Sequence, residues 1–425
     1  MTVTVFLASL LGAMALGMPI AFALIVCALA LMALQGSFDT TILSQKLIEG
    51  ADSYPLLAIP FFIFAGELMN KGGMSRRIVD FALALVGHIR GGLGLVAIFA
   101  AIVMAAISGS AAADAAALST LLIPMMRSAG YDVPRSAGLI AAGSIIAPCM
   151  PPSVALIVFG VVANVSIGKL FMATIVPGLL MGVSLVIAWM WVVRKDRIAA
   201  LPRKSLREVL SVSRRAVWAL IMPFAIVGGM KFGLFTPTEA AVVACAYALL
   251  VGMFVNRELR WRDLYPLLVT AAKTTSIVVF LIAAALVSAW LITTSAVPEQ
   301  IAAMLSPFME SPRTLMFVMM VLVVIVGTAL DFAPTLMILT PVLMPIVKLA
   351  GIDPVYFGVL FIMNNAIGLI TPPVGIVLNV VSGVAKISMA DVVKGCWPFL
   401  IAETIVLFLL VLFPSIVMIP YRWLT

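Results

Sequence analysis

The chain has 425 residues, of which 64% are hydrophobic and 10% are charged. A water-soluble domain of this length does not need so much apolar surface, whereas a helix needs about 20 apolar residues to cross a bilayer. Roughly ten stretches of that kind follow one another, so we expect an all-α polytopic membrane protein. The formal net charge of +8 sits in short loops between them, which is typical of membrane orientation rather than of nucleic-acid binding.

The single histidine and the four cysteines exclude several function classes. Metal-dependent membrane enzymes take their ligands from several His or Cys side chains at close spacing, and this sequence has no such cluster. His88 lies in a basic loop, where we expect an interfacial residue rather than the base of a serine hydrolase. The cysteines all lie in apolar stretches and predict packing rather than disulfides. A membrane metalloenzyme or protease is therefore disfavoured.

The first apolar stretch, Val3 to Leu34, runs for about 30 residues without a charge, and we interpret it as one permanent span rather than a signal peptide. Further along, the basic loops 71–90, 127–135 and 256–263 indicate cytoplasmic sides. Residues 91–126 leave and return to the same side, which predicts a re-entrant hairpin or a tight pair of spans.

The strongly charged segment Arg194 to Arg215 divides the chain. It carries eight basic residues against two acidic ones and is too short for a soluble domain. We interpret it as a cytoplasmic linker, residues 194–215, between a first unit at 1–193 and a second at 216–425.

The two units repeat one pattern. Residues 91–180 align with 312–401 at a constant shift of 221. The positions that coincide include a Pro-Pro pair, two further prolines and a Gly-x-Asp turn: Pro124 with Pro345, Gly130 and Asp132 with Gly351 and Asp353, Pro151 and Pro152 with Pro372 and Pro373, and Pro177 with Pro398. Such duplication, with breaks inside apolar segments, is the usual construction of secondary transporters.

Each repeat is predicted to hold a hairpin (91–126 and 312–347) followed by a broken helix (136–164 and 355–385). The second hairpin begins and ends at acidic or neutral loops, so it should open to the opposite side, which makes the repeats inverted. The repeat continues weakly upstream at a shift of 218, where Pro19 and Cys27 match Pro237 and Cys245.

The hairpin turns are the first candidates for chemistry. Ser108, Gly109 and Ser110 offer free helix-end carbonyls and hydroxyls that suit Na⁺, and exposed N–H groups that suit a carboxylate. The alternative is a Gly/Ser helix-packing motif. The second turn carries Asp331, a carboxylate at membrane depth, which either contacts substrate or cation or caps the following helix. Asp114 is as well explained by capping or packing.

The Pro-Pro pairs are the second pair of candidates. Proline removes a backbone donor and disturbs the preceding turn, so Pro151-Pro152 and Pro372-Pro373 predict discontinuous helices that act as hinges. Carbonyls freed at this depth must line a cavity or be buried in protein. In contrast, Thr236 to Glu239 has a complete structural explanation as a capping box.

These breaks lead to two site hypotheses. One Na⁺ is expected between Ser108–Ser110 and Ala147–Met150, and a second between Gly327–Asp331 and Gly368–Val374. The candidate ion ligands are Ser108, Ser110, Ala147, Met150, Gly327, Asp331, Gly368, Thr371 and Val374. An organic acid is expected between the hairpin turns, and its candidate contacts are Ser110, Ser153, Asp331, Asn364, Asn365 and Asn379.

Over essentially its whole length, the chain resembles the large membrane subunit of tripartite ATP-independent periplasmic (TRAP) transporters. The segments that carry the likeness are Ile107–Ser110, Ile146–Pro152, Phe235–Ala241, Asp331–Pro345 and Ile367–Gly375. The resemblance implies a sodium-driven importer of organic acids, a dicarboxylate or a sugar acid, in a bacterial inner membrane. It also implies an elevator-type architecture of the ion-transporter superfamily, a small four-span membrane partner and a soluble periplasmic binding protein. Cys149-Met150 departs from the pattern, because Ile370-Thr371 stands at the equivalent break.

Two alternatives stay open at this point. A stand-alone sodium/anion symporter of related fold would not depend on a binding protein. A channel subunit would show rings of charge or a polar pore face, whereas here the polar residues concentrate at four breaks.

Overall fold

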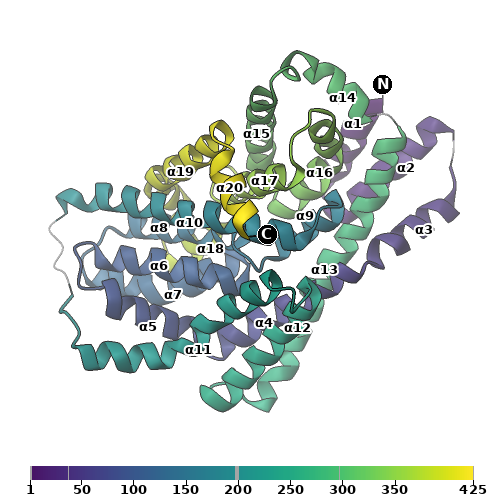
Figure 1. Ribbon diagram of the computed structural model, residues 1–425. Helices are drawn as coiled ribbons and strands as arrows, with labels where there is room; N and C mark the ends of the chain where they lie inside the picture. Colours follow the sequence, from purple (N-terminus) through teal and green to yellow (C-terminus); the bar gives the residue numbers. More distant parts are fainter. Residues whose placement is uncertain (1, 37, 197–200, 296, 425) are drawn as a thin grey trace.

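The computed structural model describes residues 2–36, 38–196, 201–295 and 297–424. All the regular structure in these ranges is helical, as Figure 1 shows. The helices of the first half are α1 (Thr2–Ala15), α2 (Ile20–Gln35), α3 (Thr40–Ala51), α4 (Ala58–Lys71), α5 (Met74–Val86), α6 (Gly92–Ser108), α7 (Ala111–Ser128), α8 (Val133–Ser144), α9 (Val154–Ala163) and α10 (Ile167–Val192). Those of the second half are α11 (Leu206–Lys231), α12 (Pro237–Leu250), α13 (Trp261–Thr294), α14 (Val297–Leu305), α15 (Pro312–Ala329), α16 (Phe332–Leu349), α17 (Pro354–Gly368), α18 (Ile376–Ala385), α19 (Met389–Leu412) and α20 (Ser415–Leu424). Short 3-10 turns η1 (Tyr54–Leu57), η2 (Ala147–Cys149), η3 (Val193–Lys195) and η5 (Ser306–Phe308), and the π-turn η4 (Val251–Val255), complete the set.

The prediction of a polytopic all-α membrane protein is confirmed. Within the described residues, six helices are long and apolar enough to cross a bilayer, or eight if two bent helix pairs each count as one span. One bent pair is the predicted broken helix 136–164, in which α8 with η2 meets α9 at 44°. Six further apolar helices are shorter, so the roughly ten stretches counted from the sequence include several half-length pieces.

The prediction of one span over Val3 to Leu34 is wrong. The stretch forms two helices, α1 and α2, that pack against each other. Gly17 adopts a left-handed φ of 80°, and Pro19 stands directly before α2. Apolar composition continues through this turn, so hydropathy alone conceals the break, whereas a glycine and a proline two residues apart are a turn signal.

The linker between the halves is also shorter than predicted. Residues 197–200 lie outside the described ranges, and α11 already begins at Leu206, inside the predicted linker 194–215. Ser205 starts it, because its Oγ accepts from the N–H of Glu208 (3.3 Å) and the Glu208 carboxylate accepts from the N–H of Ser205 (2.7 Å). The charged segment is thus partly the first turns of a helix.

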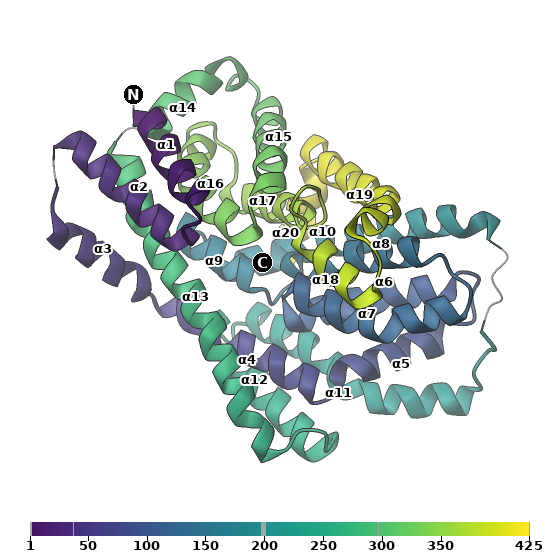
Figure 2. The same ribbon diagram turned by 180° about the vertical axis from the view of Figure 1, so that it is seen from behind.

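One group of helices lies to the side of the two repeats. α4 packs against α12 and α13, while α13 also packs against α2 and α3 along its 34 residues. Figures 1 and 2 show α13 running obliquely past this group. α12 begins as predicted, since Thr236 and Glu239 exchange the bonds of a capping box at 3.3 and 2.7 Å. We call α2–α4 and α11–α13 the scaffold.

The predicted hairpins and broken helices are all present, and their bounds repeat. α7 and α16 begin 221 residues apart and also end 221 residues apart. The halves are interleaved, because α7 packs against α18 of the other half and α16 packs against α9. Figure 2 shows α18 lying with α6, α7 and α8. We call the set α6–α10 and α15–α19 the core.

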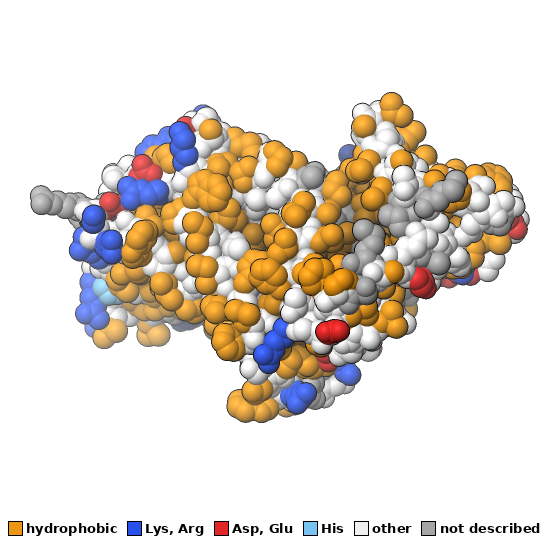
Figure 3. Space-filling model, turned by 90° about the horizontal axis from the view of Figure 1, so that it is seen from above, with side chains coloured by type: hydrophobic (Ala, Val, Ile, Leu, Met, Phe, Trp, Pro, Cys, Tyr) orange, Lys and Arg blue, Asp and Glu red, His pale blue; other side chains and the backbone are white. Residues whose placement is uncertain are grey.

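The base of the first hairpin is fixed by Trp189 of α10. Its indole N–H donates to the carbonyl of Gly91 at 2.8 Å, and its ring stacks on Tyr131 with centroids 5.9 Å apart. At the surface, hydrophobic side chains cover much of the molecule, and Lys and Arg gather at the left end and at the lower edge in Figure 3. This segregation is typical of a protein held in a bilayer with its basic loops on one side.

Candidate functional site

The tip of the first hairpin is a closed network of hydroxyls around one buried carboxyl group. Gly109 ends α6 with φ 60°, and Ser110 starts α7 by accepting from the N–H of Ala113 at 3.4 Å. Ser108 Oγ accepts from the N–H of Ser110 at 3.2 Å and donates to Asp114 Oδ1 at 2.6 Å. Asp114 is fully buried, and its Oδ2 has no hydrogen-bond partner. Asp114 Oδ2 is therefore a buried oxygen that could accept a further ligand.

The tip of the second hairpin also combines a carboxylate with a hydroxyl group, but the two occupy each other's positions. Asp331 starts α16, and its Oδ1 accepts from the N–H of Phe332 at 2.6 Å. Thr335, which aligns with Asp114, donates its hydroxyl to the carbonyl of Asp331 at 2.9 Å. Each tip therefore carries a hydroxyl and a carboxylate one helical turn apart, in opposite order: Ser110 with Asp114, and Asp331 with Thr335.

Both broken helices are interrupted at the Pro-Pro pairs, which contain the cis bonds Pro151-Pro152 and Pro372-Pro373. After the first break, Ser153 starts α9 by accepting from the N–H of Ala155 at 3.2 Å. After the second, Gly375 starts α18 with a left-handed φ of 44°. The broken geometry is thus present at both predicted positions.

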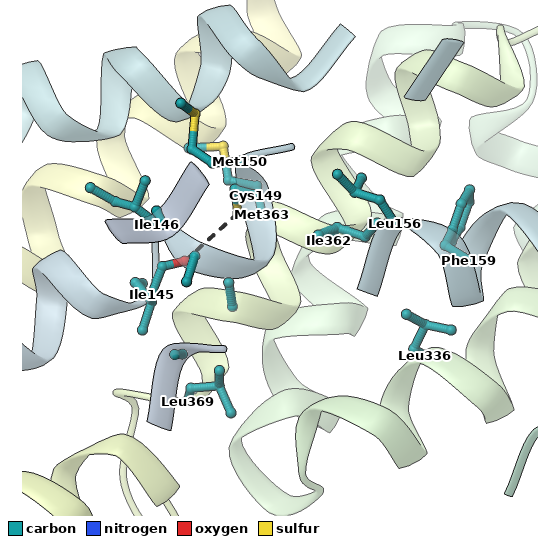
Figure 4. Packing of buried hydrophobic residues seen from close by; sticks show 14 of the residues in the cluster. Ile145, Ile146, Cys149, Met150, Leu156, Phe159, Leu336, Ile362, Met363 and Leu369 are labelled. Carbon is teal, nitrogen blue, oxygen red and sulfur yellow. Dashed lines mark hydrogen bonds between the residues drawn. The ribbon is translucent and has the colours of Figure 1, made fainter. Parts of the chain in front are cut away.

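Apolar packing holds the first break in place. Cys149 and Met150 are buried, and η2 packs against α6 and α17. Figure 4 shows the Cys149 thiol directed at the carbonyl of Ile145, which it meets at 3.8 Å, with Met363 of α17 nearby. The break is therefore embedded in protein, as irregular backbone at membrane depth must be.

Each hairpin tip touches the break of its own half. A Cβ on Gly109 would lie 3.1 Å from the carbonyl oxygen of Pro152. In the second half, a Cβ on Gly368 would lie 2.9 Å from the carbonyl oxygen of Gly327. Asn365 links the same pair, since its Nδ2 donates to the carbonyl of Phe332 at 2.7 Å while its buried Oδ1 has no partner. Glycine at these points lets the two backbones approach.

The two tips also meet each other across one cavity of about 420 Å³. The tips contribute Ser108, Ser110 and Asp331, and the first break contributes Pro148. The opposite wall belongs to the scaffold, whose polar lining residues are Glu67 and Asn70 of α4 and Thr274 of α13. No Lys or Arg lines this cavity in the described part of the chain. Elements more than two hundred residues apart in the sequence therefore line one cavity, in which a few polar side chains converge.

The structure distributes the predicted site residues over three places. Ser108, Ser110 and Asp331 line the cavity, and Gly327 and Gly368 form the second contact between tip and break. The others are tied to their own surroundings: Ser153 caps α9, Asn364 donates to the Met320 carbonyl, Asn379 to that of Val374 and Thr371 to that of Ile367. Ala147 and Met150 are buried around η2. The ligand roles of all these residues stay predictions.

The sequence analysis missed Glu67, Asn70 and Thr274 as cavity residues. Glu67 and Asn70 are three positions apart on α4, so they share a helix face. A carboxylate inside the apolar segment was the available signal for Glu67. Thr274 gave no such signal, because hydroxyl side chains satisfied by their own helix are common in spans, and its Oγ1 donates to the Thr270 carbonyl at 3.1 Å.

The orphaned buried oxygens fit an oxygen-seeking cation at each tip. Asp114 Oδ2 stands at the first tip and Asn365 Oδ1 at the second, and both are shielded from water. Among the described residues, there is no group of three His, Cys, Asp or Glu side chains that would hold a transition metal. Hydroxyl, carboxyl and carbonyl oxygens are the donors that hard cations prefer.

A cavity between two hairpin tips, bordered by broken helices and scaffold helices, is the arrangement expected of a membrane permease. Residues 7–416 match the family described as "Tripartite ATP-independent periplasmic transporter, DctM component". The chain belongs to this family and is a multi-pass protein of the inner membrane.

Several curated relatives are large permease proteins of TRAP transporters. The 2,3-diketo-L-gulonate TRAP transporter large permease protein YiaN of Escherichia coli is 52% identical over 423 residues, covering 100% of both chains. The sialic acid TRAP transporter large permease protein SiaM of Vibrio cholerae is 39% identical, covering 95% of each chain. The C4-dicarboxylate permease DctM of Pseudomonas aeruginosa is 38% identical, covering 90% of each.

A solved structure shares the fold. The YdaH transporter of Alcanivorax borkumensis superposes with a TM-score of 0.65, covering 90% of this chain and 88% of that one, at 15% sequence identity.

Proposed function

We propose that this permease imports an organic acid by sodium-coupled secondary transport, and that the acid binds in the cavity between the two hairpin tips. The observation that carries the proposal is the lining of that cavity, which combines both tips, a Pro-Pro break and two scaffold helices. A volume of about 420 Å³ suits a small metabolite. Transporters built from repeats bind substrate at the interface of those repeats, near the middle of the membrane.

The polar lining favours a hydroxyl-rich sugar acid over a plain dicarboxylate. Glu67, Asn70 and Asp331 offer acceptor oxygens that suit hydroxyl donors. The substrate carboxylate would face the N–H groups at the start of α7, near Ser110, because no guanidinium is available there. The relative that is 52% identical is named for 2,3-diketo-L-gulonate, a keto sugar acid, which agrees with this choice.

Charge balance supports sodium as the coupling ion. Glu67 and Asp331 face the cavity, and Asp114 is buried behind the first tip. An anionic substrate entering among these groups would be repelled unless cations enter with it. The first Na⁺ would use Ser108, Ser110 and carbonyls of Ala147 and Met150, and Asp114 is an additional ligand. The second would use carbonyls of Gly327, Gly368 and Val374, with Asp331 and Thr371.

The division into core and scaffold supports an elevator mechanism. The cavity lies on the boundary, with tips and breaks on one side and α4 and α13 on the other. Within the core, the halves are interleaved through α7 with α18 and α9 with α16, so it would move as one body. Sliding of this body along the scaffold would expose the cavity to each side in turn.

The family name implies two further components, and we propose both as partners. A small membrane subunit would complete the membrane part, and a soluble periplasmic binding protein would deliver the acid. The scaffold is the natural place for a static partner, because its helix α12 keeps large apolar side chains exposed, among them Val242 and Leu250.

Reconstitution tests this proposal against its two rivals. Proteoliposomes containing this chain and the small subunit should accumulate labelled sugar acid only with an inward sodium gradient and loaded binding protein. Uptake that needs no binding protein would identify a stand-alone symporter. Flux that follows the substrate gradient alone, without sodium and without accumulation, would identify a channel subunit.

A further inference from the structure

A second, larger cavity lies away from the transport site, between the first turns of α11, the start of α5 and the end of α12. Its volume is about 780 Å³, and four arginines line it: Arg77, Arg207, Arg214 and Arg215. We call this cavity the basic groove. Nothing in the transport function explains why so much positive charge should face one hollow.

The floor of the basic groove is fixed by contacts between α5 and η4. Arg77 Nη1 donates to the carbonyl of Gly73 at 2.9 Å and pairs with Glu258 at 2.7 Å. Asn256, which also lines the groove, donates its Nδ2 to the carbonyl of Gly72 at 2.8 Å. The hollow is therefore a preformed surface rather than a gap between loose side chains.

The wall contributed by α11 presents its charge without a protein partner. Arg207, Arg214 and Arg215 are seven and eight positions apart, so they share one helix face. Within the described residues, none of the three forms an ion pair. The lining contains no acidic side chain. Unpaired guanidinium groups that converge on a hollow favour a phosphate-bearing anion, whose oxygens match the guanidinium fork.

Apolar residues at the same groove indicate that the anion is part of a lipid. Leu210 and Trp218 line it and are 72% and 42% exposed. Beyond Trp218, α11 continues as an apolar helix whose Ile221 and Phe224 are exposed. The basic loops that flank the groove lie on the cytoplasmic side by the orientation bias. The groove thus stands where headgroups end and acyl chains begin.

We propose that the basic groove binds the headgroup of an anionic phospholipid of the cytoplasmic leaflet, with its acyl chains along the exposed apolar face of α11. The lipid would neutralise Arg207, Arg214 and Arg215 and fasten the scaffold to the bilayer, while the core moves. Inorganic phosphate would contact only the arginines, whereas a phospholipid would also cover the apolar side chains of Leu210 and Trp218.

The test compares lipid retention in two variants that lose the same charge. The groove variant is Arg207→Gln/Arg214→Gln/Arg215→Gln. The control is Arg76→Gln/Arg203→Gln/Arg262→Gln, whose positions lie outside the groove lining. Purified, delipidated protein is titrated with dioleoyl phosphatidylglycerol or phosphatidylcholine and examined by native mass spectrometry. Wild type and control should retain phosphatidylglycerol selectively. The groove variant should bind it about a hundredfold more weakly, because each of the three basic residues contributes about a factor of five near an anionic surface.

Several results would overturn the proposal. Equal phosphatidylglycerol retention in both variants would show that the groove is not the site. Full displacement of the lipid by excess inorganic phosphate would identify a phosphate site instead. Loss of bound lipid in the complex with the small subunit, together with a cross-link from that subunit to position 214, would identify a protein occupant.

A measurement on the wild type protects the test against a misfolded variant. A photoreactive phosphatidylglycerol should label peptides around Leu210 and Trp218. Labelling confined to other helices would reject the groove even if the variants cannot be purified.

Discussion

Gly327 and Gly368 bring the second hairpin and the second broken helix into backbone contact, with room for only 2.9 Å between a Cβ on Gly368 and the carbonyl oxygen of Gly327. Neither residue has a positive φ, so glycine is required here for space rather than for backbone freedom. The contact places the carbonyl of Gly327 beside the backbone of the break at Gly368. It is therefore the point at which packing and the proposed second Na⁺ site depend on each other.

Replacing Gly368 with alanine should separate tip from break. The new methyl group meets backbone atoms that cannot rotate away, and overpacking of this kind costs roughly 1–3 kcal/mol. We expect a lower thermal stability and a several-fold higher sodium concentration for half-maximal uptake. Gly383→Ala is the control, because a Cβ there meets nothing within 4 Å. Unchanged sodium dependence in Gly368→Ala would separate this contact from ion binding.

Asp331→Asn should abolish or severely reduce uptake while leaving insertion and assembly intact, because it removes charge at the cavity and keeps side-chain size. The control is Asp353→Asn, which alters a carboxylate that also caps a helix, accepting from Val355 at 2.7 Å, but does not line the cavity. The measurement is sodium-driven uptake in proteoliposomes with both membrane subunits and loaded binding protein. Equal, small effects of the two changes would leave helix capping as the role of Asp331.

Thr371→Val together with Ser108→Ala should raise the sodium concentration needed for uptake. Each change removes one hydroxyl oxygen from a proposed ion site. The loss of Ser108 also leaves buried Asp114 without its 2.6 Å donor. Thr174→Val is matched to Thr371→Val, since Thr174 likewise donates to its own helix at 3.0 Å but is buried outside the cavity. A double variant with the sodium dependence of wild type would argue strongly against both sites.

The inversion of the two halves is testable by labelling. Single cysteines at Arg203 and Arg260 should react with a membrane-impermeant thiol reagent only from the cytoplasm, and a cysteine at Glu310 only from the periplasm. All three positions are exposed or partly exposed, so access depends on side rather than on burial. Reaction of positions 203 and 310 from one side would rule out the inverted arrangement.

Much of the fold was predictable because proline and glycine indicate turns and helix breaks even inside continuous apolar segments. The Pro-Pro pairs predicted both broken helices, and the turn around Gly109 predicted the first hairpin, since these residues restrict the backbone locally. Gly17 and Pro19 also indicated a turn, but the prediction followed the continuous apolar composition, so one span was predicted where two helices form. The start of α11 was missed because charge was weighed above the capping pattern from Ser205 to Glu208.

The candidate site was predictable only in part, because its walls come from different regions of the chain. The hairpin tips were predicted from residues adjacent in the sequence. The opposite wall contains Glu67 and Thr274, and their position at the cavity depends on how α4 and α13 pack. Asn364 and Asn365 looked available from the sequence, but their amide N–H groups are bonded to helix carbonyls at 2.6 and 2.7 Å. Burial and pairing of a polar side chain are tertiary properties that residue type does not reveal.

The interleaving of α7 with α18 and of α16 with α9 has a consequence for biosynthesis. When the first half, residues 1–193, leaves the ribosome, the surfaces of α7 and α9 that pack against α18 and α16 are uncovered, because α16 ends only at Leu349 and α18 at Ala385. Contacts of such long sequence separation form late. The nascent first half should therefore depend on lipid or on insertion factors to shield those surfaces. A chain that stops in the linker should be degraded rather than persist as an independently folded half.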